Sequence, residues 1–404
     1  MRVALLSVSG EIGGSETSLL ELVRGLVARP GIEAIVVTPK DGPLAERARA
    51  IGAATRIAPM PEALTAFGEW SMRSAVELGR RTVTLARAAG ATRRYGATMA
   101  KLLEEVGADV IHTNGFKMHV LAARTARRGV PVVWHMHEYL TPRPLSRILL
   151  RHHLPRVAAV VANSRSVAAD LAEALGAGAP ISTIYNAVDL QAFAPAGAAA
   201  DLDRMARLAP APAGVCRVGL LATFARWKGH DVFLRAIAGC RAPLRAYVIG
   251  APVYDTAGSQ LTVQELRSRA EALGIGDRVG FTGFASRAAD AIRALDVVVH
   301  ASTEPEPFGL VIAEAMACGR AVIVSRAGGA AEIVEDGVDA LATPPGDAGA
   351  LAAAIDRLAG DGALRARLGA AARAAAERRF DPAEFVGRFV ELYTRVSRGE
   401  AVPA

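Results

Sequence analysis

Short runs of apolar residues recur along the chain, separated by stretches with the 3.6-residue period of amphipathic helices. The first run, residues 3–8, leads through a glycine-rich turn into a helical pattern at Leu19, Leu22, Val23 and Leu26. Further runs in the first half cover residues 34–38, 109–112, 130–135, 158–162 and 181–185. Buried parallel strands consist of such continuous apolar runs, so the alternation predicts a parallel sheet wrapped by helices.

The same alternation restarts after residues 194–214, which are rich in alanine, proline and glycine. Strands are expected at 215–222, 244–250, 278–281, 296–301, 321–325 and around residue 340; helices are expected at 231–238, 263–273, 309–318, 348–359 and 364–379. We therefore predict an α/β fold of two doubly wound, Rossmann-like domains, residues 1–195 and 215–379, joined by a linker at 196–214. Ligands bind beyond the carboxyl ends of such strands, so two facing domains would enclose a deep cleft.

Length and composition agree with this division. A chain of 404 residues exceeds what one core usually accommodates, and a hydrophobic content of 51% permits two cores. The three cysteines, Cys216, Cys240 and Cys318, lack paired spacing and are expected to be reduced core residues. The first apolar run is too short for a signal peptide, and no uncharged stretch reaches spanning length. We expect a cytoplasmic protein.

Positive charge is concentrated in the first half, although the net charge of the whole chain is only +7. Residues 71–101 carry seven basic side chains and one acid, and residues 143–165 carry five arginines and no acid. In the second segment, apolar and basic residues interleave; they are Leu145, Ile148, Leu149 and Leu154 with Arg147, Arg151, His152, His153 and Arg156. This pattern is typical of a peripheral surface resting on anionic lipid, and equally of an ordinary solvated helix face.

Two carboxylates, Glu306 and Glu314, stand on either side of a Pro-Phe-Gly turn that predicts the start of a helix. Eight helical residues rise about 12 Å and leave the ends about 80° apart, so both could face one ligand. Carboxylates accept hydrogen bonds from sugar and ribose hydroxyls, while the Phe308 and Gly309 amides would attract an anion. The alternative is that the glutamates only offset a helix dipole or face solvent. The apolar run around Glu314 favours a ligand, because a buried carboxylate needs a partner.

Two further elements could bind an anion. Arg226 and Lys228 follow the first predicted strand of the second half. Their charge would suit a bound diphosphate and would stabilise a departing nucleoside diphosphate without a metal. The alternative is a basic surface turn. Gly13 and Gly14 lie in a turn that lacks the third glycine and the ribose acid of the dinucleotide fingerprint. We predict that their amides approach a ligand, although a simple tight turn is the alternative.

A pair of histidines, His135 and His137, ends another predicted strand and shares one face by strand alternation. A metal site is conceivable, but the sequence offers no matching third ligand. We expect His137 to orient a hydroxyl or sugar and His135 to be a hydrogen-bonded core residue. Asp201 and Asp203 mimic the acidic pair of metal-dependent sugar transferases but lie in the predicted linker, so we assign them no such role.

Together these motifs resemble the family 4 retaining glycosyltransferases, which have the two-domain GT-B architecture. The resemblance covers nearly the whole chain. It rests on Gly13, Gly14, His137, the Asn186-Ala-Val-Asp189 segment with Phe193, the Arg226-Trp-Lys-Gly element, residues 306–314, Gly319, Gly328, Gly329 and Glu332. Two departures are Thr223, where the family has an arginine, and Ala187, where it has a glycine.

The resemblance implies roles for individual residues. The donor, a UDP or GDP hexose, would be bound by Gly14, Lys228, Glu306, Phe308, Gly309, Leu310 and Glu314, with the diphosphate on Lys228 and the ribose on Glu314. The acceptor would be bound by Gly13, Glu16 and His137. The catalytic set would be His137, Arg226, Lys228 and Glu306, with no metal and no cofactor besides the donor.

The resemblance also implies transfer of a hexose, with retained configuration, to a hydroxyl of a saccharide or a lipid-linked acceptor, as in polysaccharide assembly. The leaving phosphate itself would help to deprotonate the acceptor. Residues 380–404 would form a helix that crosses back to the first domain. Two alternatives remain, a nucleotide-sugar epimerase of the same fold and a non-catalytic basic binding module; a nucleic-acid partner is not expected for the transferase.

Overall fold

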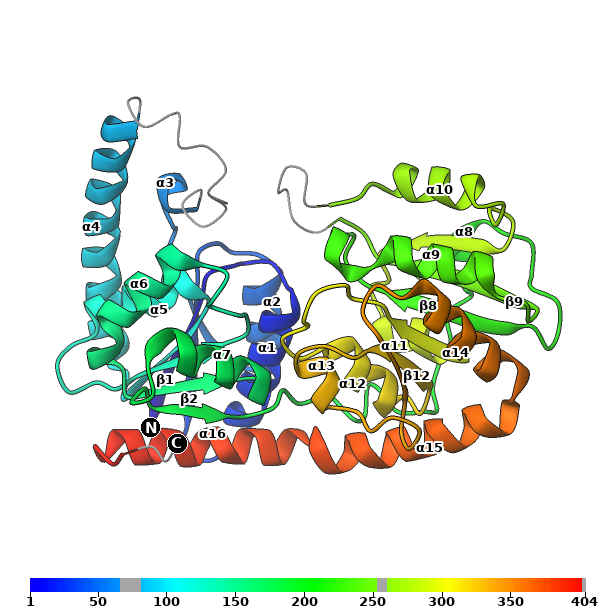
Figure 1. Ribbon diagram of the computed structural model, residues 1–404. Coiled ribbons are helices and arrows are strands. Elements are labelled where there is room, and N and C mark those ends of the chain that lie inside the picture. Colours follow the sequence, from blue (N-terminus) through cyan, green and yellow to red (C-terminus); the bar gives the residue numbers. More distant parts are fainter. Residues whose placement is uncertain (66–80, 253–259, 402–404) are drawn as a thin grey trace. The chain divides into compact units, whose positions relative to one another are not determined.

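The computed structural model describes residues 1–65, 81–252 and 260–401 (Figure 1). The chain forms two compact units. Unit 1 comprises Met1–Asn186 with Pro382–Ala404, and unit 2 comprises Ala187–Asp381. Residues 71–80 of the basic segment lie outside the described part of the chain.

Unit 1 contains a seven-stranded parallel sheet in the order β3-β2-β1-β4-β5-β6-β7. The strands are β1 (Arg2–Ser7), β2 (Glu33–Thr38), β3 (Ala54–Ile57), β4 (Val110–Asn114), β5 (Val132–Met136), β6 (Ala159–Ala162) and β7 (Ile181–Thr183). The helices are α1 (Gly14–Val27), α2 (Pro43–Ile51), α3 (Glu62–Thr65), α4 (Arg81–Val106), α5 (Phe116–Thr125), α6 (Pro144–His153), α7 (Arg165–Leu175) and α16 (Pro382–Ser397), with a 3-10 turn η3 (Leu154–Arg156) after α6.

The edge strand β3 is missing from the sequence prediction, whereas the other six strands of unit 1 lie where apolar runs predicted them. Its four residues, Ala54 to Ile57, place two polar residues between two apolar ones and are half-buried or exposed. An edge strand pairs on one side only, so it needs no continuous apolar run. The pattern that identified the buried strands could not detect it.

Unit 2 contains a six-stranded parallel sheet in the order β10-β9-β8-β11-β12-β13. The strands are β8 (Cys216–Leu221), β9 (Leu244–Ile249), β10 (Val279–Gly283), β11 (Val297–His300), β12 (Ala321–Ser325) and β13 (Leu341–Thr343). The helices are α8 (Leu202–Ala206), α9 (His230–Gly239), α10 (Val263–Ala272), α11 (Ala288–Arg293), α12 (Leu310–Ala317), α13 (Gly329–Glu332), α14 (Ala348–Gly360) and α15 (Gly362–Arg379), with a 3-10 turn η4 (Arg226–Lys228) after β8. All three cysteines are buried thiols of this unit.

The predicted linker at 196–214 is part of unit 2. It contains α8, and Asp203 on that helix is buried. The Asp203 carboxylate accepts hydrogen bonds from Tyr247 Oη at 2.7 Å and from an Arg217 guanidinium nitrogen at 3.0 Å. These contacts attach the segment to β8 and β9. The chain therefore changes unit after Asn186 and again before Pro382, not at residues 195 and 380.

The C-terminal helix α16 returns the chain to unit 1. Tyr393 Oη lies 2.7 Å from His112 Nδ1 on β4, and both side chains are buried. Where α16 passes α1, a Cβ at Gly25 would lie 2.3 Å from Val386, so the glycine permits close helix packing. Within the described ranges, no helix is both long and apolar enough to cross a bilayer.

Candidate functional site

The strand order of unit 2 reverses direction between β8 and β11. From β8 the chain moves outward to β9 and β10, then crosses to β11 and continues to β12 and β13 on the other side. In doubly wound sheets, the loops that leave the carboxyl ends of the two strands at this point diverge and leave a crevice for a ligand. In this unit, Lys228 follows β8 and Glu306 follows β11. The topology therefore places these two predicted residues on either side of the switch point.

Lys228 and Glu306 form an ion pair. The Lys228 ammonium nitrogen lies 2.7 Å from Glu306 Oε2 and 3.0 Å from Oε1. Their side chains are only 19% and 10% exposed, so the pair is poorly screened by water. The same nitrogen lies 4.0 Å from the centre of the Trp227 ring, a cation–π distance.

Glycine at position 229 allows this approach. Gly229 adopts φ of 74°, and a Cβ there would lie 1.8 Å from the carbonyl oxygen of Ala301 at the end of β11. Only a residue without a side chain can bring the two loops this close. The Thr303 amide then donates to the Trp227 carbonyl at 2.8 Å, which joins the loop of Lys228 to the loop of Glu306.

Two residues that the sequence analysis missed hold the Glu306 carboxylate. Ser302 Oγ donates to Glu306 Oε2 at 3.0 Å, and His300 Nε2 lies 3.1 Å from the same oxygen. Burial alone would raise the pKa of Glu306, but the Lys228 charge and the His300 hydrogen bond outweigh it and hold the pKa well below its usual range. Glu306 is therefore ionised at neutral pH.

Helix α12 begins at Leu310, so the predicted geometry of eight helical residues between Glu306 and Glu314 is wrong. Glu306 is extended and forms a parallel bridge with Gly328, and Gly309 caps the helix with φ of 92°. In the described part of the chain, the Gly309 and Leu310 amides donate to no other group. These two donors at the helix start are available to an anion.

Glu314 lies on α12 one turn after its start. Its side chain keeps some exposed surface, yet the dense surroundings raise its pKa to about 8. Across residues 1–65, 81–252 and 260–401, no hydrogen bond or ion pair of its carboxyl group is found. A half-buried carboxyl group without a protein partner is the arrangement expected where a ligand supplies the hydrogen-bond donors.

Arg226 is placed differently. Its guanidinium lies 3.8 Å from Glu265 Oε1 on α10, and half of its side chain is exposed. The structure thus directs Arg226 toward α10, whereas it directs Lys228 toward Glu306. A direct diphosphate contact by Arg226 remains a prediction, as does its substitution for the arginine that the family has at Thr223.

The switch point of unit 1 lies between β1 and β4 and assembles a second group of predicted residues. Gly13 and Gly14 follow β1, Asn114 ends β4, and His137 follows β5. The Asn114 side-chain amide donates to the Ser15 carbonyl at 3.1 Å, and its oxygen lies 3.1 Å from His137 Nε2. Asn114, which the sequence analysis did not select, therefore connects the glycine turn to His137.

This network defines the state of His137. Because the Asn114 amide nitrogen donates to Ser15, its oxygen must accept the Nε2 proton of His137. Burial lowers the pKa of His137 to about 3, so the imidazole is neutral at pH 7. Nδ1 then carries the lone pair and can accept a hydrogen bond from a hydroxyl group.

His135 packs against His137, with ring centres 4.0 Å apart, but it is not the hydrogen-bonded core residue that we predicted. It is fully buried, and neither of its ring nitrogens has a hydrogen-bond partner among the described residues. Burial holds its pKa well below the usual value. Within the described segments, no group of three or more His, Cys, Asp or Glu side chains is arranged to share a metal ion.

Glu16, a predicted acceptor ligand, is turned back onto its own helix. Its carboxylate accepts from the Gly13 amide at 3.1 Å, from Ser15 Oγ at 2.9 Å and from Ser7 Oγ at 3.3 Å. These bonds cap α1 and leave Glu16 only 5% exposed. Gly14 differs, because a Cβ at this position would meet no atom within 4 Å. The open side of the turn is therefore at Gly14.

Two family models match the chain. The model described as Glycosyltransferase Family 4 matches residues 12–192, and the model described as Glycosyl transferases group 1 matches residues 217–375. The D-inositol 3-phosphate glycosyltransferase of Xylanimonas cellulosilytica is 32% identical over 314 residues, which cover 72% of each chain. The enzyme of the same name from Nocardiopsis dassonvillei is 34% identical over 272 residues, covering 63% of this chain and 62% of its own.

Solved structures resemble the whole chain. Anabaena HepE in complex with UDP has a TM-score of 0.79 and 26% identity, covering 98% of this chain and 100% of its own. Sucrose-phosphate synthase from Thermosynechococcus elongatus has a TM-score of 0.78 at 22% identity, covering 99% and 100%, and shows the shared GT-B fold. With its two Rossmann-like units and these relatives, the chain belongs to the family 4 glycosyltransferases and is a glycosyltransferase of the GT-B type.

Proposed function

We propose that the protein transfers a hexose from UDP-hexose or GDP-hexose to a hydroxyl group of a saccharide acceptor, with retained configuration and without a metal. The observation that carries the proposal is the Lys228–Glu306 ion pair at the switch point of unit 2. It places a cation and a hydroxyl-accepting carboxylate within one hydrogen bond of each other. A sugar diphosphate offers the complementary pair of groups, an anion next to hydroxyls.

Donor binding exchanges partners within this pair. A diphosphate oxygen takes over hydrogen bonds from Lys228, and the amides of Gly309 and Leu310 offer further donors at the start of α12. Glu306 remains fixed by Ser302 and His300, so its freed oxygen accepts from a donor-sugar hydroxyl. Glu314 accepts from the ribose hydroxyls.

In the transfer step, the acceptor oxygen forms a bond to the anomeric carbon while the bond from that carbon to the diphosphate oxygen breaks. The acceptor proton moves to the departing phosphate oxygen on the same face, so configuration is retained. Lys228 stabilises the negative charge that accumulates on the diphosphate. Glu306 holds its charge in an ion pair, which suits a sugar-positioning group better than a nucleophile.

The acceptor hydroxyl is assigned to the site in unit 1. His137 Nδ1 accepts its hydrogen bond and orients the oxygen, while the backbone at Gly14 leaves space beside it. The names of similar proteins support parts of this proposal. HepE was solved with UDP-glucose, and the two relatives compared above are named D-inositol 3-phosphate glycosyltransferase. UDP-glucose is therefore the first donor to test.

We further propose that the acceptor is lipid-linked or belongs to a growing cell-surface polysaccharide, and that the enzyme works at an anionic membrane surface. The basic and apolar residues of α6 support this location, because Leu145, Ile148 and Leu149 are exposed there. The protein would then be cytoplasmic and peripheral to the membrane.

The test is a donor panel with the purified protein. Isothermal titration with UDP, GDP and their hexose derivatives identifies the nucleotide, and NMR of the product reports the anomeric configuration. Transfer that persists in EDTA supports metal independence. Lys228→Met should abolish transfer, while Lys101→Met, a matched change at a lysine exposed on α4, should not.

Two other functions predict different outcomes. A nucleotide-sugar epimerase would convert the donor without any acceptor. A basic binding module would bind its anionic partner equally well after Lys228→Met and Glu314→Gln. Either result, together with absent transfer across the panel, would refute the proposed reaction.

A further inference from the structure

Helix α6 exposes a stripe of large apolar side chains. Leu145, Ile148 and Leu149 are 53%, 63% and 44% exposed, and their spacing of three and four residues places them on one face. They are three of the nine large apolar side chains exposed in the described part of the chain. The helix contains no acidic residue, and helical periodicity places Arg147 and Arg151 on one side of the stripe, beyond Ile148.

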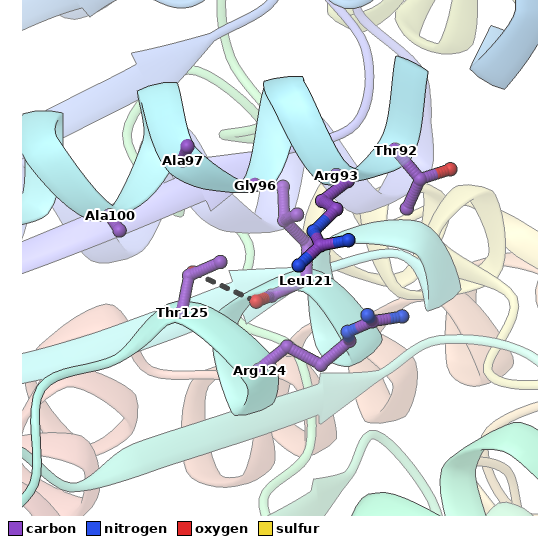
Figure 2. A pocket seen from close by; sticks show the side chains of 8 residues that line it. All are labelled: Thr92, Arg93, Gly96, Ala97, Ala100, Leu121, Arg124 and Thr125. Atoms are coloured by element: carbon purple, nitrogen blue, oxygen red, sulfur yellow. Dashed lines mark hydrogen bonds between the residues drawn. The ribbon is translucent and has the colours of Figure 1, made fainter. Parts of the chain in front are cut away.

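A hollow of about 290 Å³ lies between α4 and α5 (Figure 2). Arg93 on α4 and Arg124 on α5 both extend over it from opposite helices. Small residues of α4 leave the space open, and no acidic side chain lines it; the other lining residues are Thr92, Gly96, Ala97, Ala100, Leu121 and Thr125. The hollow is therefore bordered by two guanidinium groups and by short side chains.

The stripe and the hollow lie on neighbouring helices of unit 1. Helix α5 lies beside α4 and packs against α6 (Figure 1). Burial lowers the pKa of His153 at the end of α6, and the positive charges of His152, Arg124 and Arg156 lower it further. The arginines at the hollow, Arg93 and Arg124, therefore lie on helices next to the basic residues of α6.

These arginines have no carboxylate partner within the described residues. No ion pair is found for Arg93, Arg124, Arg147 or Arg151, whereas Glu138, near the start of α6, is bound to Arg143 at 2.5 Å. Guanidinium groups that share a surface without acids repel one another, and an anion placed between them relieves the repulsion. The planar fork of arginine matches the oxygens of a phosphate group.

We propose that the surface formed by α4, α5 and α6 docks on an anionic lipid bilayer, with a lipid phosphate seated between Arg93 and Arg124. Leu145, Ile148 and Leu149 enter the boundary between headgroups and acyl chains, and the arginines contact the headgroups. A bilayer fits both parts of the surface, because it presents phosphates next to an apolar layer. The inference deepens the membrane location proposed above and does not depend on the sugar chemistry.

The test measures co-sedimentation of the full-length protein with vesicles. One set contains equal parts of phosphatidylcholine and phosphatidylglycerol, and the other only phosphatidylcholine. The double variant Arg93→Gln/Arg124→Gln removes two charges from the hollow. Arg241→Gln/Arg357→Gln is the matched control, because it removes the same charge from exposed positions of unit 2.

The wild-type protein should bind the anionic vesicles and not the neutral ones. Loss of two surface cations lowers the partition coefficient about 30-fold, so the hollow variant should show this loss and the control should not. Leu145→Ser/Ile148→Ser should also weaken binding, and since both side chains are exposed, circular dichroism should show an unchanged fold.

Equal loss of vesicle binding in both arginine double variants would overturn the proposed phosphate site between Arg93 and Arg124. Equal binding of the wild-type protein to neutral and anionic vesicles would overturn it as well. Binding of inorganic phosphate at this hollow without any vesicle binding would identify a soluble anion site and also overturn the inference. Transfer to a water-soluble acceptor is assayed separately. If transfer is absent while vesicle binding follows the expected pattern, the proposed reaction fails and the docking surface stands.

Discussion

The Lys228–Glu306 pair allows the loss of function and the loss of stability to be separated. Replacing Lys228 by methionine keeps an unbranched side chain that is only one atom shorter, but leaves the Glu306 carboxylate without the Lys228 cation. Glu306 is 8% exposed, so water cannot fully replace the lost partner. The hydrogen bonds from Ser302 and His300 remain.

The expected magnitude follows from this burial. Breaking a buried ion pair by removing one partner destabilises by about 3–5 kcal/mol. The two remaining hydrogen bonds favour the lower end of this range. For a cooperative unit of about 200 residues, 1 kcal/mol shifts Tm by about 2–4 °C, so Lys228→Met should lower the Tm of unit 2 by about 10 °C.

A second variant tests the cause. In Lys228→Met/Glu306→Gln the buried charge is gone, while the amide can still hydrogen-bond to Ser302. Calorimetry should show that the double variant regains more than half of the lost Tm. Transfer from UDP-glucose, or from the donor that the panel identifies, should be absent in both variants. Lys101→Met should match the wild type in both assays.

Two results would refute this reasoning. Turnover by Lys228→Met close to that of the wild type would show that the donor diphosphate does not depend on this cation. A double variant as unstable as the single one would show that the unpaired Glu306 charge is not the source of the instability.

Three further predictions follow. In the proposed donor site, ribose hydroxyls donate to the ionised form of Glu314, whose pKa in the free protein is raised to about 8. The affinity for UDP should therefore rise with pH between about 6 and 8, and titration calorimetry should show a weaker rise for Glu314→Gln. Burial lowers the pKa of His112 and His137 from the usual 6.5 to about 3, so between pH 3 and pH 6.5 the unfolded chain binds more protons than the folded chain. Urea unfolding should therefore show the full free energy of unfolding above pH 6.5 and a progressive loss of it as the pH falls toward 3. Gly309→Ala puts a Cβ 2.6 Å from Ile312 Cδ1 at a residue with φ of 92°. Thermal unfolding should show a loss of about 1–2 kcal/mol in the free energy of unfolding, and UDP should bind more weakly. An unchanged Tm would show that position 309 does not require glycine.

The two sheets could be predicted from the sequence because most of their strands are buried on both faces. Strands such as 321–325 are continuous apolar runs, and a run of this kind ends near the point where a functional loop begins. Lys228 and Glu306 were predicted from such positions, each in the loop after an apolar run. Topology then brings together two residues that are 78 positions apart.

Other parts of the site depend on contacts that no local pattern records. His300 is the last residue of an apolar strand, and its relation to Glu306 appears only when the loop after β11 folds back. Asn114 acts through a carbonyl 99 positions away. Glu16 differs, because its partners are local: its carboxylate caps the start of α1 by accepting from the Gly13 amide and Ser15 Oγ. The S/T/G-x-x-E spacing of residues 13–16 was the local signal for that role.

The electrostatics of the free protein explain why a diphosphate suits the site in unit 2. Glu314 is largely protonated at pH 7 because of its raised pKa, and Lys228 is neutralised by Glu306. A neutral hexose brings no charge with which to displace Glu306 from Lys228, whereas a diphosphate does. Glu306 can then turn to the sugar hydroxyls only after the diphosphate has engaged Lys228. In the proposed reaction, sugar recognition is therefore coupled to recognition of the diphosphate, which is the leaving group of the transfer.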